Sequence, residues 1–147
     1  HFVDKYDLLN AGIRDSFQTL LSQRIPERHT FTLANLRILA LTAHEYLAGF
    51  AGHCASSSSN DDDGLMVRQV QRQLHAIVLE WLRQTPVRPN TPNSIEVTAM
   101  VVSWAIFGSI LEVAWNSRKI SSEQLVSQIL ALLEPGIRDF LEAQAVR

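Results

Sequence analysis

The chain has 147 residues, of which 46% are hydrophobic, 13 are Lys or Arg and 15 are Asp or Glu. This composition excludes a disordered or collagen-like chain and is typical of one globular domain, because two domains sharing this length would each lie near the lower limit of stable size. A net charge of −2 leaves no general positive field for nonspecific nucleic-acid binding. Any DNA contact must be local or made by residues outside this chain.

Apolar residues at helical spacing predict an all-α fold, with no alternation typical of strands. The expected helices cover residues 4–24, 33–54, 65–84, 94–115 and 121–134, and a short last helix or a bent continuation follows Pro135-Gly136. Residues 56–64 carry no apolar side chain and are predicted to form a mobile loop. Asn93 with Glu96, and Ser121 with Gln124, have the spacing of capping boxes at the starts of the last two long helices.

The helix expected over 94–115 is apolar nearly all round, so it must be buried on two sides. Its uncharged run from Val97 to Leu111 is shorter than the roughly 20 residues of a membrane span, which favours a buried helix. Together with the helix that follows, it suggests a homodimer through an intermolecular four-helix bundle, against the alternative of a large monomeric core. The expected interface residues are Val102, Ile106, Ile110, Leu125, Ile129, Leu132 and Leu133.

Catalytic and metal-binding motifs are missing from the sequence. His44-Glu45 begins like the HExxH zinc motif, but Ala48 stands where the second His is required. The five histidines form no pair three or four residues apart, and no phosphate-binding or nucleophile motif is present. We therefore expect no enzyme, no metal and no cofactor. The single cysteine, Cys54, is expected to be a reduced thiol, which fits a cytoplasmic protein.

Aromatic and polarisable side chains from four helices are of the kind that lines an apolar ligand pocket, although ordinary core packing explains them as well. The candidate pocket residues are Phe17, His44, Phe50, Val78, Trp81, Met100, Ser103, Trp104 and Phe107. Glu45, Glu80 and Glu112 lie within or beside apolar helices, where each could pair with a cationic ligand or simply occupy a solvated face.

Two stretches resemble the tetracycline-repressor (TetR) family of bacterial regulators. The opening HFVDKYDLL is similar to the end of that family's DNA-binding domain and the start of its connecting helix; the matching positions are His1, Phe2, Asp4, Lys5, Leu8 and Leu9. The family's preceding Tyr is absent because the chain begins after it. The stretch VVSWAIFGSILEVAWNSRKISSEQLVSQILALLEPGI resembles the two dimerising helices, with a small-residue segment at Gly108 and a Trp115 end. The middle of the chain, residues 33–84, matches only in helix count.

The resemblance implies a TetR-like C-terminal domain of about five to six helices. Residues 1–3 would be a remnant of a helix-turn-helix domain, and 4–147 would bind a small-molecule effector and form a homodimer that changes operator binding. Lys5 would touch a DNA phosphate, although a solvated lysine is the alternative. The expected function is thus that of the regulatory domain of a TetR-type transcriptional repressor. The alternative is a helical interaction or dimerisation module without a small-molecule pocket.

Overall fold

The structure is a computed structural model that describes residues 5–25, 30–54, 60–85, 94–116 and 119–145. Within these ranges the chain forms five helices and no strand, which confirms the all-α prediction. The helices are α1 (Lys5–Arg24), α2 (Leu33–Cys54), α3 (Asn60–Arg83), α4 (Ile95–Trp115) and α5 (Ser122–Ala145).

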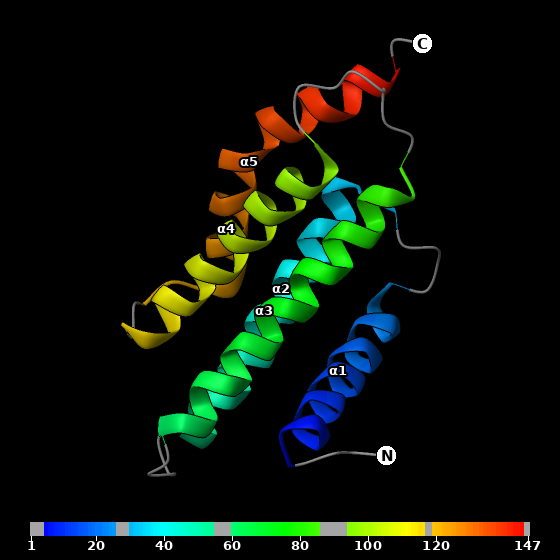
Figure 1. The fold of residues 1–147 in the computed structure, drawn as a ribbon. Coiled ribbons are helices and arrows are strands. Elements are labelled where there is room, and N and C mark those ends of the chain that lie inside the picture. The colour runs from blue at the N-terminus through cyan, green and yellow to red at the C-terminus, as the bar shows by residue number, and fades with distance from the viewer. Residues whose placement is uncertain (1–4, 26–29, 55–59, 86–93, 117–118, 146–147) are drawn as a thin grey trace.

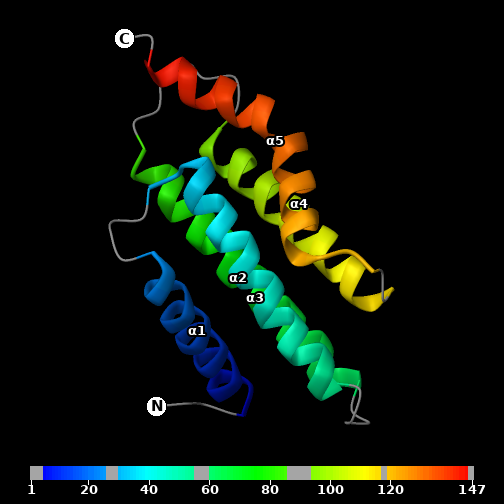
Figure 2. The same cartoon turned by 180° about the vertical axis from the view of Figure 1, so that it is seen from behind.

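The helices lie in three layers (Figure 1). The antiparallel pair α2 and α3 forms the middle layer, α1 packs on one side of it, and α4 with α5 packs on the other. The view from behind shows the same order, with α1 and α5 at opposite edges (Figure 2). Among the described helices α1 contacts only α2 and α3, so it can shift without disturbing α4 and α5 directly.

Two helix starts differ in detail from the predictions. The segment Asn60–Gly64, expected in a loop, is the first part of α3. Its aspartates suit the positive end of a helix, an effect that the search for apolar spacing ignores. At α4 the N-cap is Ser94, whose hydroxyl accepts a hydrogen bond from the Val97 amide at 3.1 Å. The expected cap Asn93 and the residues 55–59 lie outside the described part of the chain.

The predicted capping box at the start of α5 is confirmed. The Gln124 amide donates to the Ser121 hydroxyl at 3.1 Å, and the Ser121 amide donates to Gln124 Oε1 at 3.4 Å. Helix α5 continues through Pro135 to Ala145 and changes direction in its second half (Figure 1). The bent continuation is therefore the correct alternative of the two predicted, because the proline ring removes one helical hydrogen bond and crowds the preceding turn.

The core fills the spaces between the three layers. Phe17 of α1, Leu36 of α2 and Trp81 of α3 are among its largest fully or almost fully buried side chains. The rings of Phe17 and Tyr46 meet edge to face, with centroids 5.4 Å apart, and join α1 to α2. On the far side, α4 and α5 contribute Ile106, Ile110 and Val126, among other buried side chains, to the same cluster.

Helix α4 is buried on one side only. Its buried residues are Ala99, Val102, Ser103, Ile106, Phe107 and Ile110. The opposite side is exposed within the chain, so the predicted burial on two sides is met only on the side that packs against α2, α3 and α5. By length and composition this helix is the one described helix that could also cross a membrane, and 33% of its most apolar 18-residue stretch is buried inside the chain.

Candidate functional site

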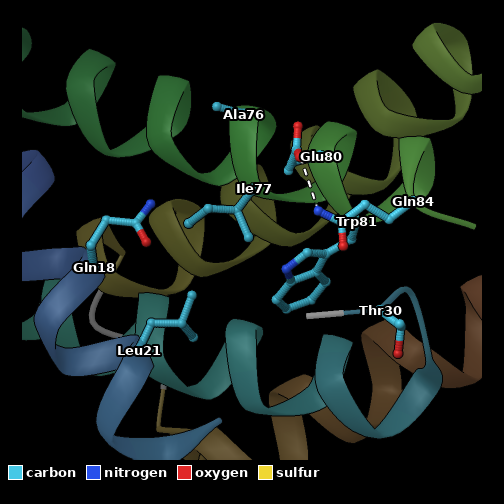
Figure 3. A pocket seen from close by; sticks show the side chains of 8 residues that line it. All are labelled: Gln18, Leu21, Thr30, Ala76, Ile77, Glu80, Trp81 and Gln84. Carbon is cyan, nitrogen blue, oxygen red and sulfur yellow. Dashed lines mark hydrogen bonds between the residues drawn. The ribbon is translucent and has the colours of Figure 1, made fainter. Parts of the chain in front are cut away.

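A cavity of about 730 Å³ opens between α1 and α3, beside the segment that leads into α2 (Figure 3). This volume lies in the range of pockets that hold small organic ligands. The lining residues come from α1, from the segment before α2, from α3 and from just beyond α3: Gln18, Leu21, Thr30, Ala76, Ile77, Glu80, Trp81 and Gln84.

The cavity has an apolar floor and a polar rim. Leu21, Ile77 and Trp81 are buried and expose only their edges to the space, and Figure 3 shows the Trp81 indole directed into it. Gln18, Thr30, Glu80 and Gln84 are exposed and carry the polar groups at the rim. On the rim, Gln84 Nε2 donates a hydrogen bond to Glu80 Oε1 at 3.0 Å. An arrangement of this kind suits a ligand with an apolar body and a polar end.

The residues predicted to line a pocket do not gather at one site. Trp81 lines the cavity, whereas Phe17, Val78, Ser103 and Phe107 are packed in the core. The Ser103 hydroxyl is used within α4, where it donates to the Met100 carbonyl at 3.2 Å.

The remaining pocket candidates lie elsewhere. His44 is half-buried on α2, and Met100 and Trp104 point outward on α4 with exposed fractions of 46% and 54%. The side chain of Phe50 lies outside the described part of the structure. Core packing, the alternative considered from the sequence, therefore accounts for about half of the predicted set.

Helix α4 presents a second candidate site, an exposed apolar face. We define this face by the exposed side chains Val97, Met100, Val101, Trp104 and Trp115. Between Val97 and Leu111 each exposed residue of α4 is apolar. Soluble single chains seldom leave a helix face of this length without polar groups, and such faces mark interaction surfaces.

The two faces of α4 are opposite to the sequence-based assignment. Val102, Ile106 and Ile110, expected at a subunit interface, are buried within the chain, while Met100 and Trp104, expected in a pocket, are exposed. Both faces are apolar, so hydrophobic spacing could not distinguish them. The face assignment is corrected accordingly.

On α5 the predicted interface residues divide in the same way. Leu125 and Ile129 are buried in the chain's own core, Leu133 is half-buried, and Leu132 is 84% exposed. Only Leu132 and part of Leu133 are therefore free to meet another surface.

A smaller groove of about 170 Å³ adjoins the exposed apolar face where α5 bends. It is lined by Val97, Thr98, Val101, Val102, Leu133, Gly136, Ile137 and Phe140. The bend at Pro135 turns the end of α5 away from its first half, and the glycine that follows carries no side chain to fill the space. The groove is thus an apolar concavity beside an apolar surface.

Helix α1 is tied to α2 at two points. The Arg24 guanidinium donates to Thr42 Oγ1 at 3.2 Å and pairs with the Glu45 carboxylate. Farther along α1, the hydroxyls of Ser16 and Tyr46 are hydrogen-bonded at 2.5 Å. These contacts join α1 to α2. Gln18 and Leu21 of α1 line the cavity together with residues of α3.

Lys5, the predicted phosphate contact, is exposed at the first residue of α1. No group of three His, Cys, Asp or Glu side chains that could hold a metal comes together in the described residues. The sequence did not predict that Gln18, Thr30 and Gln84 line a cavity. Single polar residues at the ends or outer faces of helices are common and form no recognisable motif.

No known family model matches this chain, and no curated protein or solved structure is significantly similar to it.

Proposed function

We propose that this chain is the effector-binding and dimerisation part of a TetR-type transcriptional regulator. The observation that carries the proposal is the exposed apolar face of α4, which has no polar side chain among its exposed residues from Val97 to Leu111. A second copy, related by a twofold axis, would cover this face with an identical one, as symmetric dimers do. The resemblance of residues 1–9 and 101–137 to TetR regulators supports the same reading.

The cavity between α1 and α3 supports the effector-binding half of the proposal. Helix α1 would connect this domain to a DNA-binding domain and is held to α2 by Arg24 and Tyr46. A ligand that fills the cavity would favour positions of α1 that are farther from α3, and would shift the equilibrium by its difference in affinity for the two positions. In a dimer, displacement of both α1 helices would change the spacing of the two DNA-binding domains.

Native mass spectrometry of the purified chain, with the same sample measured under denaturing conditions, tests this proposal. We expect a dimer of twice 16.5 kDa, with any co-purified effector detected as extra mass in the native spectrum. Val101→Glu should give a monomer, because a dimer would have to bury its added charges in an apolar contact. The matched control Leu8→Glu, which places the same charge at an exposed leucine on α1, should remain dimeric.

A wild-type chain that is monomeric at micromolar concentration would contradict the proposal. The alternative, a helical interaction module without a small-molecule pocket, is favoured by the same apolar face, which does not depend on the cavity. In that case the chain would form a dimer that Val101→Glu disrupts, but no small molecule would bind or change its stability. A bound effector at 100 times its dissociation constant would add about 2.7 kcal/mol to the free energy of unfolding.

A further inference from the structure

The lining of the cavity between α1 and α3 carries one charge among the described residues. Glu80 is the charged side chain, and the other polar lining groups are the amides of Gln18 and Gln84 and the hydroxyl of Thr30. Arg83, the basic residue that follows Glu80 in α3, does not line the cavity. The described part of the lining is therefore negative, with its charge at the rim rather than at the floor.

The Glu80 carboxylate retains the capacity to accept a ligand. Gln84 Nε2 donates to Oε1, and the described residues provide no partner for Oε2. Gln84 follows Glu80 by one helical turn, so this hydrogen bond limits the rotation of the Glu80 carboxylate. Glu80 lies in the last turn of α3, which ends at Arg83, and the carbonyl end of a helix carries partial negative charge. Both features favour a cation over an anion at this end of the cavity.

The floor sets a second requirement. Leu21, Ile77 and Trp81 offer hydrocarbon and indole edges to the space and no charged group. These three side chains are almost fully buried, so an organic ion would cover only their exposed edges and the neighbouring Ala76, whereas an inorganic cation would find no ligand atom there. From the charge and the floor together, we propose that the cavity binds an organic monocation whose apolar body covers Ala76 and the exposed edges of Leu21, Ile77 and Trp81 and whose charge lies beside Glu80. This inference rests on the proposed effector-binding function and specifies its ligand class.

Isothermal titration calorimetry of the 147-residue chain with tetraphenylphosphonium and tetraphenylborate tests the inference. The two ions have nearly the same size and shape and opposite charge, so the ratio of their affinities isolates the electrostatic preference of the site. The wild-type chain should bind tetraphenylphosphonium more tightly than tetraphenylborate. Equal affinities, a preference for the borate, or no binding of either ion up to millimolar concentration would overturn the inference.

Variants assign the preference to Glu80. Glu80→Gln should lower the affinity for tetraphenylphosphonium roughly fivefold, the effect expected for a partly exposed ion pair, and leave the affinity for tetraphenylborate unchanged or raised. Glu80→Lys should reverse the preference between the two ions. The matched control Glu123→Gln removes the same charge from an exposed position in the first turn of α5 and should leave both affinities unchanged.

An equal loss in Glu80→Gln and Glu123→Gln would mean that net charge rather than this site attracts the cation, which would overturn the inference. Glu80 is exposed, so its variants should fold, and circular dichroism checks this. The subunit number of the same samples separates the two proposals. A dimer that shows no preference for the phosphonium ion would refute the cationic ligand class and leave the regulator proposal standing, whereas a monomer would refute the dimeric regulator.

Discussion

At the scale of single residues, one buried side-chain oxygen in the described part of the chain lacks a hydrogen-bond partner. Gln71 of α3 is buried, and its Oε1 atom has no hydrogen-bond partner in the described structure. A buried amide oxygen without a donor lowers stability, because water satisfied it in the unfolded chain. Helical spacing alone did not predict that Gln71 is buried beside Val70.

Gln71→Met should therefore raise the free energy of unfolding by about 1 kcal/mol, because a side chain of similar volume replaces the unpaired amide. Urea unfolding followed by circular dichroism, at one protein concentration, measures the change. Gln23→Met at an exposed position on α1 is the matched control and should change stability little. A loss of stability in Gln71→Met alone would show that the amide has a partner in solution.

At the scale of elements, α4 is the helix on which the arrangement of the domain depends. It packs against α2, α3 and α5, so a loss of its first turn would weaken contacts with all three helices. The start of α4 is set by Ser94, because the hydroxyl satisfies the free amide of Val97.

Ser94→Ala should lower the free energy of unfolding by about 1 kcal/mol through loss of this cap. Thermal and urea unfolding give the difference. The control is Ser22→Ala, which changes an exposed serine whose hydroxyl only donates to the Thr19 carbonyl of its own helix. The two variants should differ clearly; equal stabilities would mean that α4 begins at another residue in solution.

At the scale of the whole molecule, the proposed dimer would be held by apolar contact. No charged residue occurs between Glu96 and Glu112, so ion pairs have little part in a contact along the middle of α4. Apolar association is insensitive to Debye screening and is strengthened by salts such as sulfate.

The dissociation constant of the dimer should accordingly change less than about threefold between about 0.05 M and about 0.5 M NaCl. Sedimentation equilibrium at the two salt concentrations measures it, and sodium sulfate should tighten the dimer. A dimer that dissociates steeply as salt rises would show that charged residues form the contact, and would place the interface away from the exposed apolar face.

The sequence by itself determined the helices of this protein. Period-3.6 spacing, the Ser121–Gln124 box and Pro135 act over a few residues, so they predicted the all-α class, the start of α5 and either a bend or a new short helix after Pro135. It also marked Glu80, together with Glu45 and Glu112, as a possible partner for a cation or a residue of a solvated face, since a carboxylate beside apolar helical residues is visible in the sequence alone.

Only the tertiary structure decided which faces meet. Helix α4 is apolar on both sides, so local spacing cannot tell Ile106 from Trp104. The packing of α4 against the other helices buries Ile106 and leaves Trp104 exposed. The cavity has the same origin, because Gln18, Thr30 and Glu80 come from separate segments that approach one another only when α1 packs beside α3. Such contacts depend on the relative positions of whole helices, which no short-range pattern records.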